Sequence, residues 1–123
     1  MNDLENALEL GRQLIRINTV KGDPDYNLLE LAGLLQTRLE SSGFITTLRD
    51  RDGEDANLYA VYGDGPVSLL YVCHMDTVAF DESHWGSIKP LGGEVIDNKL
   101  WGRGSCDVKG QTGGLVVAVE GIL

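Results

Sequence analysis

The chain has 123 residues, of which 42% are hydrophobic and 24% charged, and its 19 acidic and 10 basic side chains give a net charge of −9. This length predicts one domain with one hydrophobic core, and the negative charge excludes nucleic acid as a partner. No apolar run approaches the ~18 residues that span a bilayer and the N-terminus lacks a signal peptide, so we expect no membrane partner and a cytoplasmic protein.

Two amphipathic helices are predicted in the N-terminal part of the chain. Residues 3–17 carry apolar side chains at helical spacing, and Asn2 and Glu5 suit a capping box. The second helix is expected to start at Asp23-Pro24, as N-cap and first helical residue, and to stop at Gly43. Its predicted buried face consists of Leu28, Leu31, Leu35 and Leu39.

Three strands are predicted to follow these helices. Residues 44–48 and 57–62 favour β-structure and flank a charged turn at residues 50–55. A turn at residues 63–66 precedes the third strand, residues 68–73, which is apolar on both faces. Such a strand is usually central, with layers on both sides of its sheet. A residue at its C-terminal end lies where open α/β sheets generally place their sites.

The remaining elements are a short hairpin and a terminal helix. Residues 94–96 and 99–101 flank Asp97-Asn98, which predicts a tight turn between two strands. A glycine-rich turn at residues 102–110 then leads into a mostly apolar helix at residues 112–123. Because this helix has no C-cap signal and no later element to cover its apolar residues, we expect the chain to be a piece of a longer protein.

His74 and Asp76 form the first candidate site. They lie two residues apart at the end of the predicted central strand, so both side chains project from one face. This spacing suits a metal-binding imidazole whose other ring nitrogen donates to a carboxylate. The alternative is a loop histidine that is hydrogen-bonded to a turn aspartate.

Asp107, in the glycine-rich turn, is the second candidate. A dinucleotide site would need glycine at this position, and a P-loop would need Ser or Thr after Lys109, which is followed by Gly110. A carboxylate would also repel a phosphate, whereas a carboxylate near a histidine suits a divalent cation. The alternative, equally open on the sequence, is that Asp107 caps the following helix.

Four further side chains lie near these candidates. We expect Cys73 and Cys106 to be free thiols, because nothing in the sequence indicates an oxidising compartment. Arg103 and Lys109 could steer an anionic substrate, but we expect them to neutralise nearby carboxylates instead.

Taken together, these segments resemble the zinc-dependent aminoacylase and carboxypeptidase family that includes acetylornithine deacetylase and succinyl-diaminopimelate desuccinylase. The resemblance implies an α/β fold, a three-layer sandwich with a central mixed sheet and flanking helices. Residues 1–123 would be the N-terminal part of its di-zinc exopeptidase-like catalytic domain. The matching stretches are residues 74–78 (His-Met-Asp-Thr-Val), Trp85, Pro90, residues 98–104 (Asn-Lys-Leu-Trp-Gly-Arg-Gly) and residues 107–110 (Asp-Val-Lys-Gly).

The resemblance also implies roles for the candidate residues. His74 is similar to a zinc ligand, Asp107 to the aspartate that bridges two zinc ions, and Asp76 to the catalytic-site carboxylate that orients the histidine. The peptide bond after Asp107 is expected to be cis. A complete site would hold two zinc ions, or cobalt or manganese in their place, and would hydrolyse amide bonds in N-acyl amino acids or small peptides.

The family pattern continues with a Glu-Glu pair, another acidic ligand, an inserted dimerisation domain and a distal histidine, none of which we find in residues 1–123. We therefore expect these residues to be inactive alone, and either to self-associate or to lack a C-terminal part. The alternative function is that of a truncated non-catalytic remnant, or an interaction module that oligomerises or docks on a partner chain.

Overall fold

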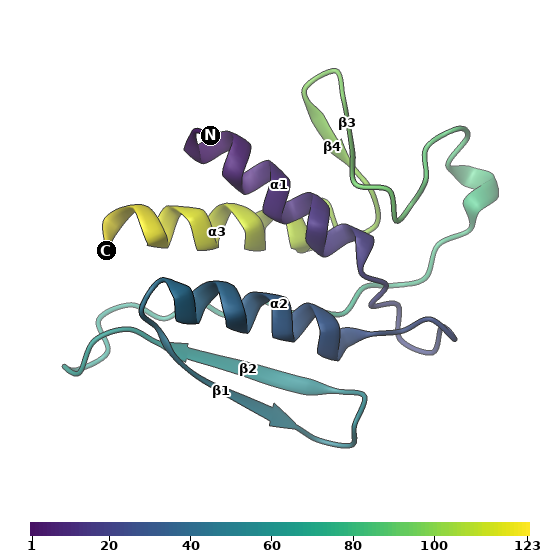
Figure 1. Cartoon of the computed structure of the whole chain (residues 1–123). Coiled ribbons are helices and arrows are strands. Elements are labelled where there is room, and N and C mark those ends of the chain that lie inside the picture. The colour runs from purple at the N-terminus through teal and green to yellow at the C-terminus, as the bar shows by residue number, and fades with distance from the viewer.

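The computed structural model describes all residues, 1–123, as a small α/β fold with three helices of 14 residues each and two β-hairpins (Figure 1). This confirms the predicted mixture of helix and strand. None of the helices has the length and apolar character that crossing a membrane requires. The elements are α1 (Asp3–Arg16), α2 (Leu28–Ser41), β1 (Ile45–Asp50), β2 (Ala56–Val61), the short 3₁₀ helix η1 (Glu82–His84), β3 (Glu94–Ile96), β4 (Lys99–Trp101) and α3 (Lys109–Ile122).

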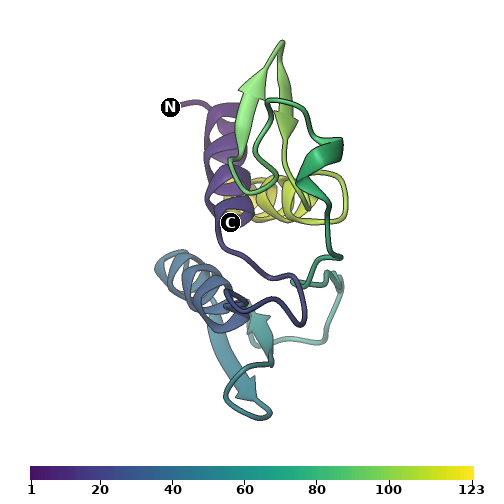
Figure 2. The ribbon, with the colours of Figure 1, turned by 90° about the vertical axis from the view of Figure 1, so that its right-hand side faces the viewer.

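The first helix begins as the sequence predicts. The Asn2 side chain accepts a hydrogen bond from the Glu5 backbone N–H at 2.9 Å, and the Glu5 carboxylate accepts one from the Asn2 N–H at 3.0 Å. This reciprocal pair is the expected capping box. The opposite end of α1 lies beside the β3–β4 hairpin, where Arg12 Nε donates to the Gly93 carbonyl at 2.8 Å (Figure 2).

The predicted start of the second helix at Asp23-Pro24 is wrong. The N-cap is Asn27, whose side chain accepts from the Glu30 N–H at 3.2 Å. The Asp23 carboxylate is already used in the preceding turn, where it accepts from the Asp25 N–H at 2.8 Å, so the chain enters the helix four residues later. The predicted stop is confirmed, because Gly43 follows the helix with φ +95°.

The strands predicted at residues 44–48 and 57–62 are confirmed, and so is the hairpin predicted at residues 94–101. β1 pairs antiparallel with β2 around the charged turn, and β3 pairs antiparallel with β4. The turn residues of the second hairpin, Asp97 and Asn98, have φ of +52° and +61°, as a two-residue turn of this kind requires.

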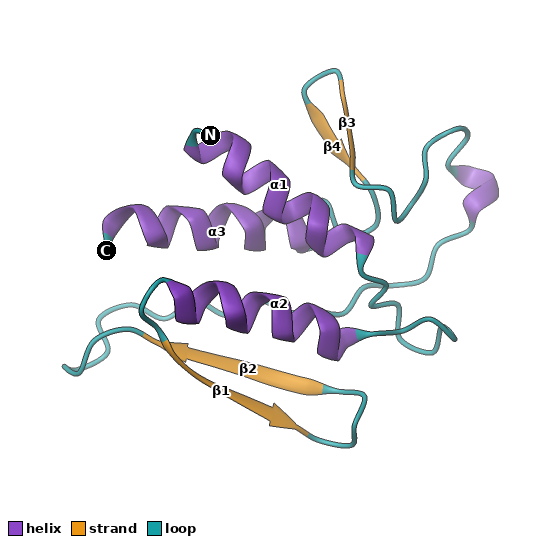
Figure 3. Cartoon of the chain, viewed as in Figure 1, coloured by secondary structure: helices purple, strands orange, loops and turns teal.

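The predicted central strand at residues 68–73 is wrong. This segment has no regular secondary structure (Figure 3), and Leu69, Leu70 and Val72 are 64%, 76% and 85% exposed. The physical reason is that a strand needs neighbours: β1 and β2 pair only with each other, β3 and β4 likewise, and no strand is left to pair with residues 68–73. The three-layer sandwich around a central mixed sheet therefore stays a prediction.

The core lies where the three helices meet, and α2 packs on both strands of the β1–β2 hairpin. α1 and α3 lie close together at Gly113, where a Cβ atom would lie 2.8 Å from the Ala7 carbonyl oxygen and 2.9 Å from the Gly11 nitrogen. An earlier element, α1, thus covers the apolar face of the terminal helix, which begins at Lys109 rather than Thr112. The core cluster comprises Leu10, Leu14, Ile17, Leu31, Leu35 and Val116.

Candidate metal centre

The structure brings His74 and Asp107 together although they lie 33 residues apart in the sequence. His74 Nε2 is 2.8 Å from Asp107 Oδ1, and His74 Nδ1 is 2.9 Å from the backbone oxygen of Asp76. The alternative of a loop histidine bonded to a turn aspartate describes the second contact only. The first contact joins the histidine to the glycine-rich turn.

Electrostatics at the pair favour a positive charge. The hydrogen bond to Asp107, followed by the one to Asp76, raises the pKa of His74 above its ordinary value of 6.5. The side chains of His74 and Asp107 are 48% and 82% exposed, so a solvated ion can reach them. Nε2 faces a carboxylate oxygen. At such a position a metal cation and a proton compete for the ring nitrogen.

Asp76 contacts His74 in a different way from the one the resemblance implies. Its backbone oxygen lies within hydrogen-bond distance of Nδ1, whereas its carboxylate oxygen Oδ1 is 3.5 Å from that nitrogen. The main chain therefore orients the imidazole here, and the carboxylate is a more distant neighbour.

The donor types of the pair fit a divalent transition metal, since imidazole nitrogen and carboxylate oxygen are both ordinary zinc ligands. Two donors are too few for a complete metal site. No group of three or more His, Cys, Asp or Glu side chains that could hold a metal ion is present in residues 1–123. Catalytic zinc sites usually have three protein ligands, so His74 and Asp107 suit part of such a site.

Asp107 lies in a tight turn that leaves no room for a side chain at Gly110. A Cβ atom at Gly110 would lie 2.1 Å from the Ser105 carbonyl oxygen, and the Lys109 N–H donates to the Gly104 carbonyl at 2.7 Å. The alternative that Asp107 caps α3 is wrong, because the N-cap is Val108 and no side chain caps this helix. The Asp107–Val108 peptide bond is cis, as the resemblance implies.

Lys109 does not neutralise a carboxylate, so that expectation is wrong. Its side chain is 2% exposed, Nζ donates to the Ile17 carbonyl at 2.7 Å, and no carboxylate pairs with it. Burial lowers the pKa of Lys109 to about 8. Arg103 forms no ion pair either; its guanidinium lies over the Trp85 ring, 5.4 Å from the centroid.

An open pocket of about 300 Å³ lies beside Asp107. Indole rings and the guanidinium of Arg103 form part of its wall, which gives it both apolar and cationic surface. Cys73 and Cys106 are free and exposed, and Cys106 also borders this pocket.

Residues 17–20 contact both candidate stretches, although no motif singled them out. Thr19 is fully buried, its hydroxyl donates to the Met75 carbonyl at 2.7 Å, and its own carbonyl accepts from the Thr77 N–H at 2.9 Å. The carbonyl of Ile17 accepts the bond from Lys109. Ile17 and Val20 are three residues apart, which is not the alternation that indicates an extended segment.

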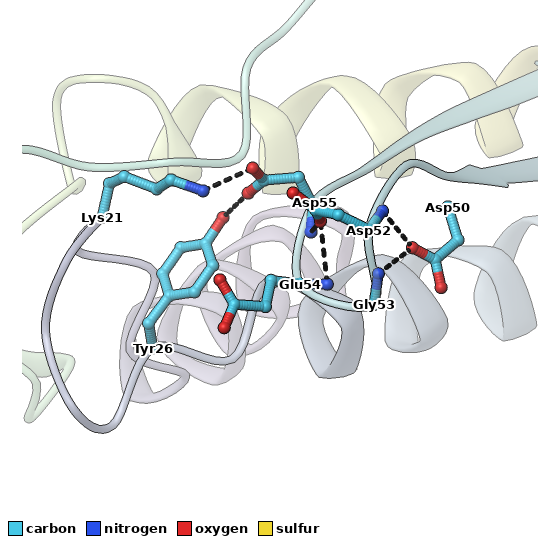
Figure 4. Close-up of polar contacts among 7 residues, drawn as sticks. All are labelled: Lys21, Tyr26, Asp50, Asp52, Gly53, Glu54 and Asp55. Atoms are coloured by element: carbon cyan, nitrogen blue, oxygen red, sulfur yellow. Dashed lines mark hydrogen bonds and ion pairs between the residues drawn. The ribbon is translucent and has the colours of Figure 1, made fainter.

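A second polar cluster fixes the chain just beyond this segment (Figure 4). Asp55, in the turn between β1 and β2, accepts hydrogen bonds from the Lys21 ammonium and the Tyr26 hydroxyl. The bond to Lys21, followed by the one to Tyr26, lowers the pKa of Asp55. The bond to Asp55 raises the pKa of Lys21, and burial, followed by the bond to Asp55, raises the pKa of Tyr26. The cluster ties the loop before α2 to the first hairpin.

Comparisons with known proteins show similarity to one family. Residues 70–123 match peptidase family M20/M25/M40. The chain is 38% identical over 123 residues to a succinyl-diaminopimelate desuccinylase of Maricaulis maris, an alignment that covers 99% of the chain and 30% of the relative. It is 35% identical over 118 residues to the enzyme of that name from Beijerinckia indica, covering 93% of the chain and 30% of the relative.

A third relative has a different name. The chain is 35% identical over 125 residues to an acetylornithine deacetylase of Pasteurella multocida, which covers 98% of the chain and 32% of that protein. The chain thus spans about a third of the length of the curated relatives that it matches. The resemblance expected from the motifs is confirmed: residues 70–123 match peptidase family M20/M25/M40, and the relatives are named as a desuccinylase and a deacetylase.

Proposed function

We propose that residues 1–123 form the N-terminal part of the catalytic domain of a metal-dependent hydrolase, which cleaves amide bonds in N-acyl amino acids or small peptides. The observation that carries this proposal is the 2.8 Å contact between His74 Nε2 and Asp107 Oδ1, within a stretch that matches the peptidase family. The names of the relatives, a desuccinylase and a deacetylase, support removal of an acyl group from an amine. The proposal includes a three-layer sandwich for the complete domain and a cytoplasmic location.

Zinc is the metal that we propose, with two ions in the complete site and cobalt or manganese as substitutes. His74 and Asp107 would hold them, His74 through Nε2 and Asp107 through its carboxylate. The chemistry that the bound metal supplies is activation of a water molecule and polarisation of the scissile carbonyl.

The chain's own residues prepare this site. Because the Asp76 carbonyl can only accept a hydrogen bond, it holds a proton on His74 Nδ1, so Nε2 is the nitrogen whose proton a metal would displace. Residues 1–123 supply two ligands, fewer than the three that catalytic zinc sites usually have. We therefore propose that they do not hydrolyse amides by themselves.

Zinc titration of the 123-residue chain by calorimetry tests the ligands. We expect His74→Ala and Asp107→Asn each to weaken zinc binding at least about tenfold, because each removes one of two donors. Asp76→Asn should cost less, since the backbone oxygen still orients the imidazole. Asp64→Asn, which alters an exposed carboxylate in a turn, is the control for charge. Unchanged zinc affinity in both His74→Ala and Asp107→Asn would contradict the proposal.

A hydrolysis assay tests the proposed inactivity of these residues alone. The zinc-loaded chain should release no amine from N-acetylated or N-succinylated amino acids. Hydrolysis that is abolished by Asp107→Asn would contradict the inactivity while supporting the role of Asp107.

A second candidate function, an interaction module that docks on a partner or on itself, is favoured by one observation. Residues 67–72 present an apolar stretch to solvent with no strand paired to it. Exposed apolar surface of this kind is typical of interaction sites. Zinc binding that depends on His74 supports the hydrolase, whereas a stable oligomer with no affinity for zinc supports the module.

A further inference from the structure

We infer that residues 17–20 (Ile-Asn-Thr-Val) are a positioning clamp, which holds the two candidate metal ligands at a fixed separation through Thr19 and Lys109. The inference rests on the proposed function, in which His74 and Asp107 bind the metal. It assigns roles to side chains outside the ligand set, and it treats Thr19 and Lys109 as positioning residues.

On the side of His74, the clamp acts through two hydrogen bonds from one buried residue. The Thr19 hydroxyl donates to the carbonyl of Met75 at 2.7 Å, and the Thr19 carbonyl accepts from the N–H of Thr77 at 2.9 Å. These two bonds grip the backbone on either side of Asp76, whose carbonyl in turn contacts the imidazole of His74. A parallel bridge between Val20 and Thr77 extends the contact.

On the side of Asp107, the clamp acts through the buried amine of Lys109. Lys109 is two residues beyond Asp107, and its Nζ donates to the Ile17 carbonyl at 2.7 Å. The lysine side chain also fills the space beside Gly104, where a Cβ atom would lie 2.9 Å from Lys109 Cδ. The turn that carries Asp107 is therefore fastened to the same short segment as the His74 stretch.

The exposure of the ligands makes such a device necessary. The His74 side chain is half exposed and the Asp107 side chain is mostly exposed, so packing around them does little to fix their separation. Residues 17–20, in contrast, follow directly on α1, and Ile17 and Val20 are both buried. A buried part of the fold thus holds two exposed side chains through the backbone next to each of them.

Zinc titration of the 123-residue chain with paired substitutions tests the clamp. Thr19→Val keeps the size of the side chain but removes the hydroxyl, and Lys109→Met keeps most of the length but removes the amine. We expect each to weaken zinc binding about 10- to 100-fold, the range found when groups that orient metal ligands are removed. Thr19→Ser retains the hydroxyl and should remain within about threefold of the unmodified chain, below that range.

Two control variants separate positioning from general stability. Leu31→Ala weakens the core in α2 but removes no side-chain hydrogen bond, and Thr46→Val removes a hydroxyl from β1. Both should keep the zinc affinity of the unmodified chain at a temperature where each is folded. If Leu31→Ala weakens zinc binding as much as Thr19→Val and Lys109→Met do, the effect is one of stability and the clamp is overturned.

Nitrogen NMR of the His74 ring in the metal-free chain tests the clamp without zinc. Thr19→Val and Lys109→Met should shift the ring ¹⁵N signals, because His74 Nε2 then loses its fixed place against Asp107, and Thr46→Val should not. If His74→Ala leaves zinc binding unchanged, the proposed metal site is wrong and these signals alone decide the clamp. Unshifted signals in both Thr19→Val and Lys109→Met would overturn it. If Thr19→Val does not fold, Lys109→Met carries both tests.

Discussion

Both ring nitrogens of His74 face oxygen atoms of aspartates, one from the main chain of Asp76 and one from the carboxylate of Asp107. Such an arrangement selects one tautomer when a metal replaces the proton on Nε2. Lys109 differs from His74, because its buried amine donates a hydrogen bond to the Ile17 carbonyl but has no carboxylate beside it. A ligand can reach the half-exposed His74, whereas Lys109 is buried and fastens the turn that carries Asp107.

At the Asp55 cluster we predict a pH dependence of stability. The pKa of Asp55 is lower in the folded chain than in the unfolded one, because Lys21 and Tyr26 donate to the charged carboxylate. Its contribution is therefore fully present above the unfolded pKa of about 3.9 and is lost as the pH falls through the lower folded pKa. When the pH is lowered from about 6 to about 3, the free energy of unfolding should therefore fall less in Asp55→Asn than in the unmodified chain.

Urea unfolding midpoints at several pH values measure this difference. Asp64→Asn serves as the control, because that carboxylate accepts no hydrogen bond from another side chain. Identical pH dependences for Asp55→Asn and the unmodified chain would show that the cluster contributes nothing to acid stability.

The sequence identifies some residues of the site and misses others for a physical reason. His74, Asp76 and Asp107 stand in motifs with specific spacing, and the structure brings His74 to both aspartates. The burial of Thr19 and Lys109 could not be predicted, because it arises only when α1, the residues after it and the start of α3 come together. The sequence suggested that Lys109 neutralises a nearby carboxylate, but tertiary packing buries its amine against the Ile17 carbonyl.

Among the elements, the contact between α1 and α3 gives the sharpest prediction. Gly113 lies against the backbone of α1, so Gly113→Ala should destabilise the chain by about 1–3 kcal/mol through overpacking. Gly114 is the next residue in the same helix, and no atom lies within 4 Å of the position that an added Cβ would take, so Gly114→Ala should stabilise the chain by up to about 1 kcal/mol. Urea unfolding of both variants checks the pair, and equal effects would contradict this account of the interface.

Elements were predictable where their signals are local. The capping box of Asn2 and the Asp97-Asn98 turn depend on neighbouring residues only, and both are present. The start of α2 was misplaced because Asp23 and Asn27 are both good caps and the turn before the helix decided between them. The strand at residues 68–73 was wrong because an apolar segment becomes a strand only beside another strand.

At the scale of the whole molecule, residues 67–72 expose apolar side chains and pair with no strand. Their exposed apolar side chains and unpaired backbone favour association between copies of the chain. We predict that sedimentation velocity shows larger species as the concentration rises, and that Leu70→Lys suppresses them. Leu4→Lys adds the same charge at another exposed leucine, on α1, and should leave the association unchanged. A monomer at every concentration, or equal effects of the two variants, would contradict this prediction.

The central claim is that His74 and Asp107 bind a metal, and anomalous X-ray scattering from a zinc-loaded crystal tests it most directly. We predict an anomalous peak about 2.0–2.2 Å from His74 Nε2 and from an Asp107 carboxylate oxygen, the usual distances for such ligands. The exposed pair of His84 and Asp81, whose Nε2 and Oδ2 are 3.8 Å apart, offers an internal comparison in the same crystal. A peak at that pair alone, or no peak beside His74, would contradict the claim.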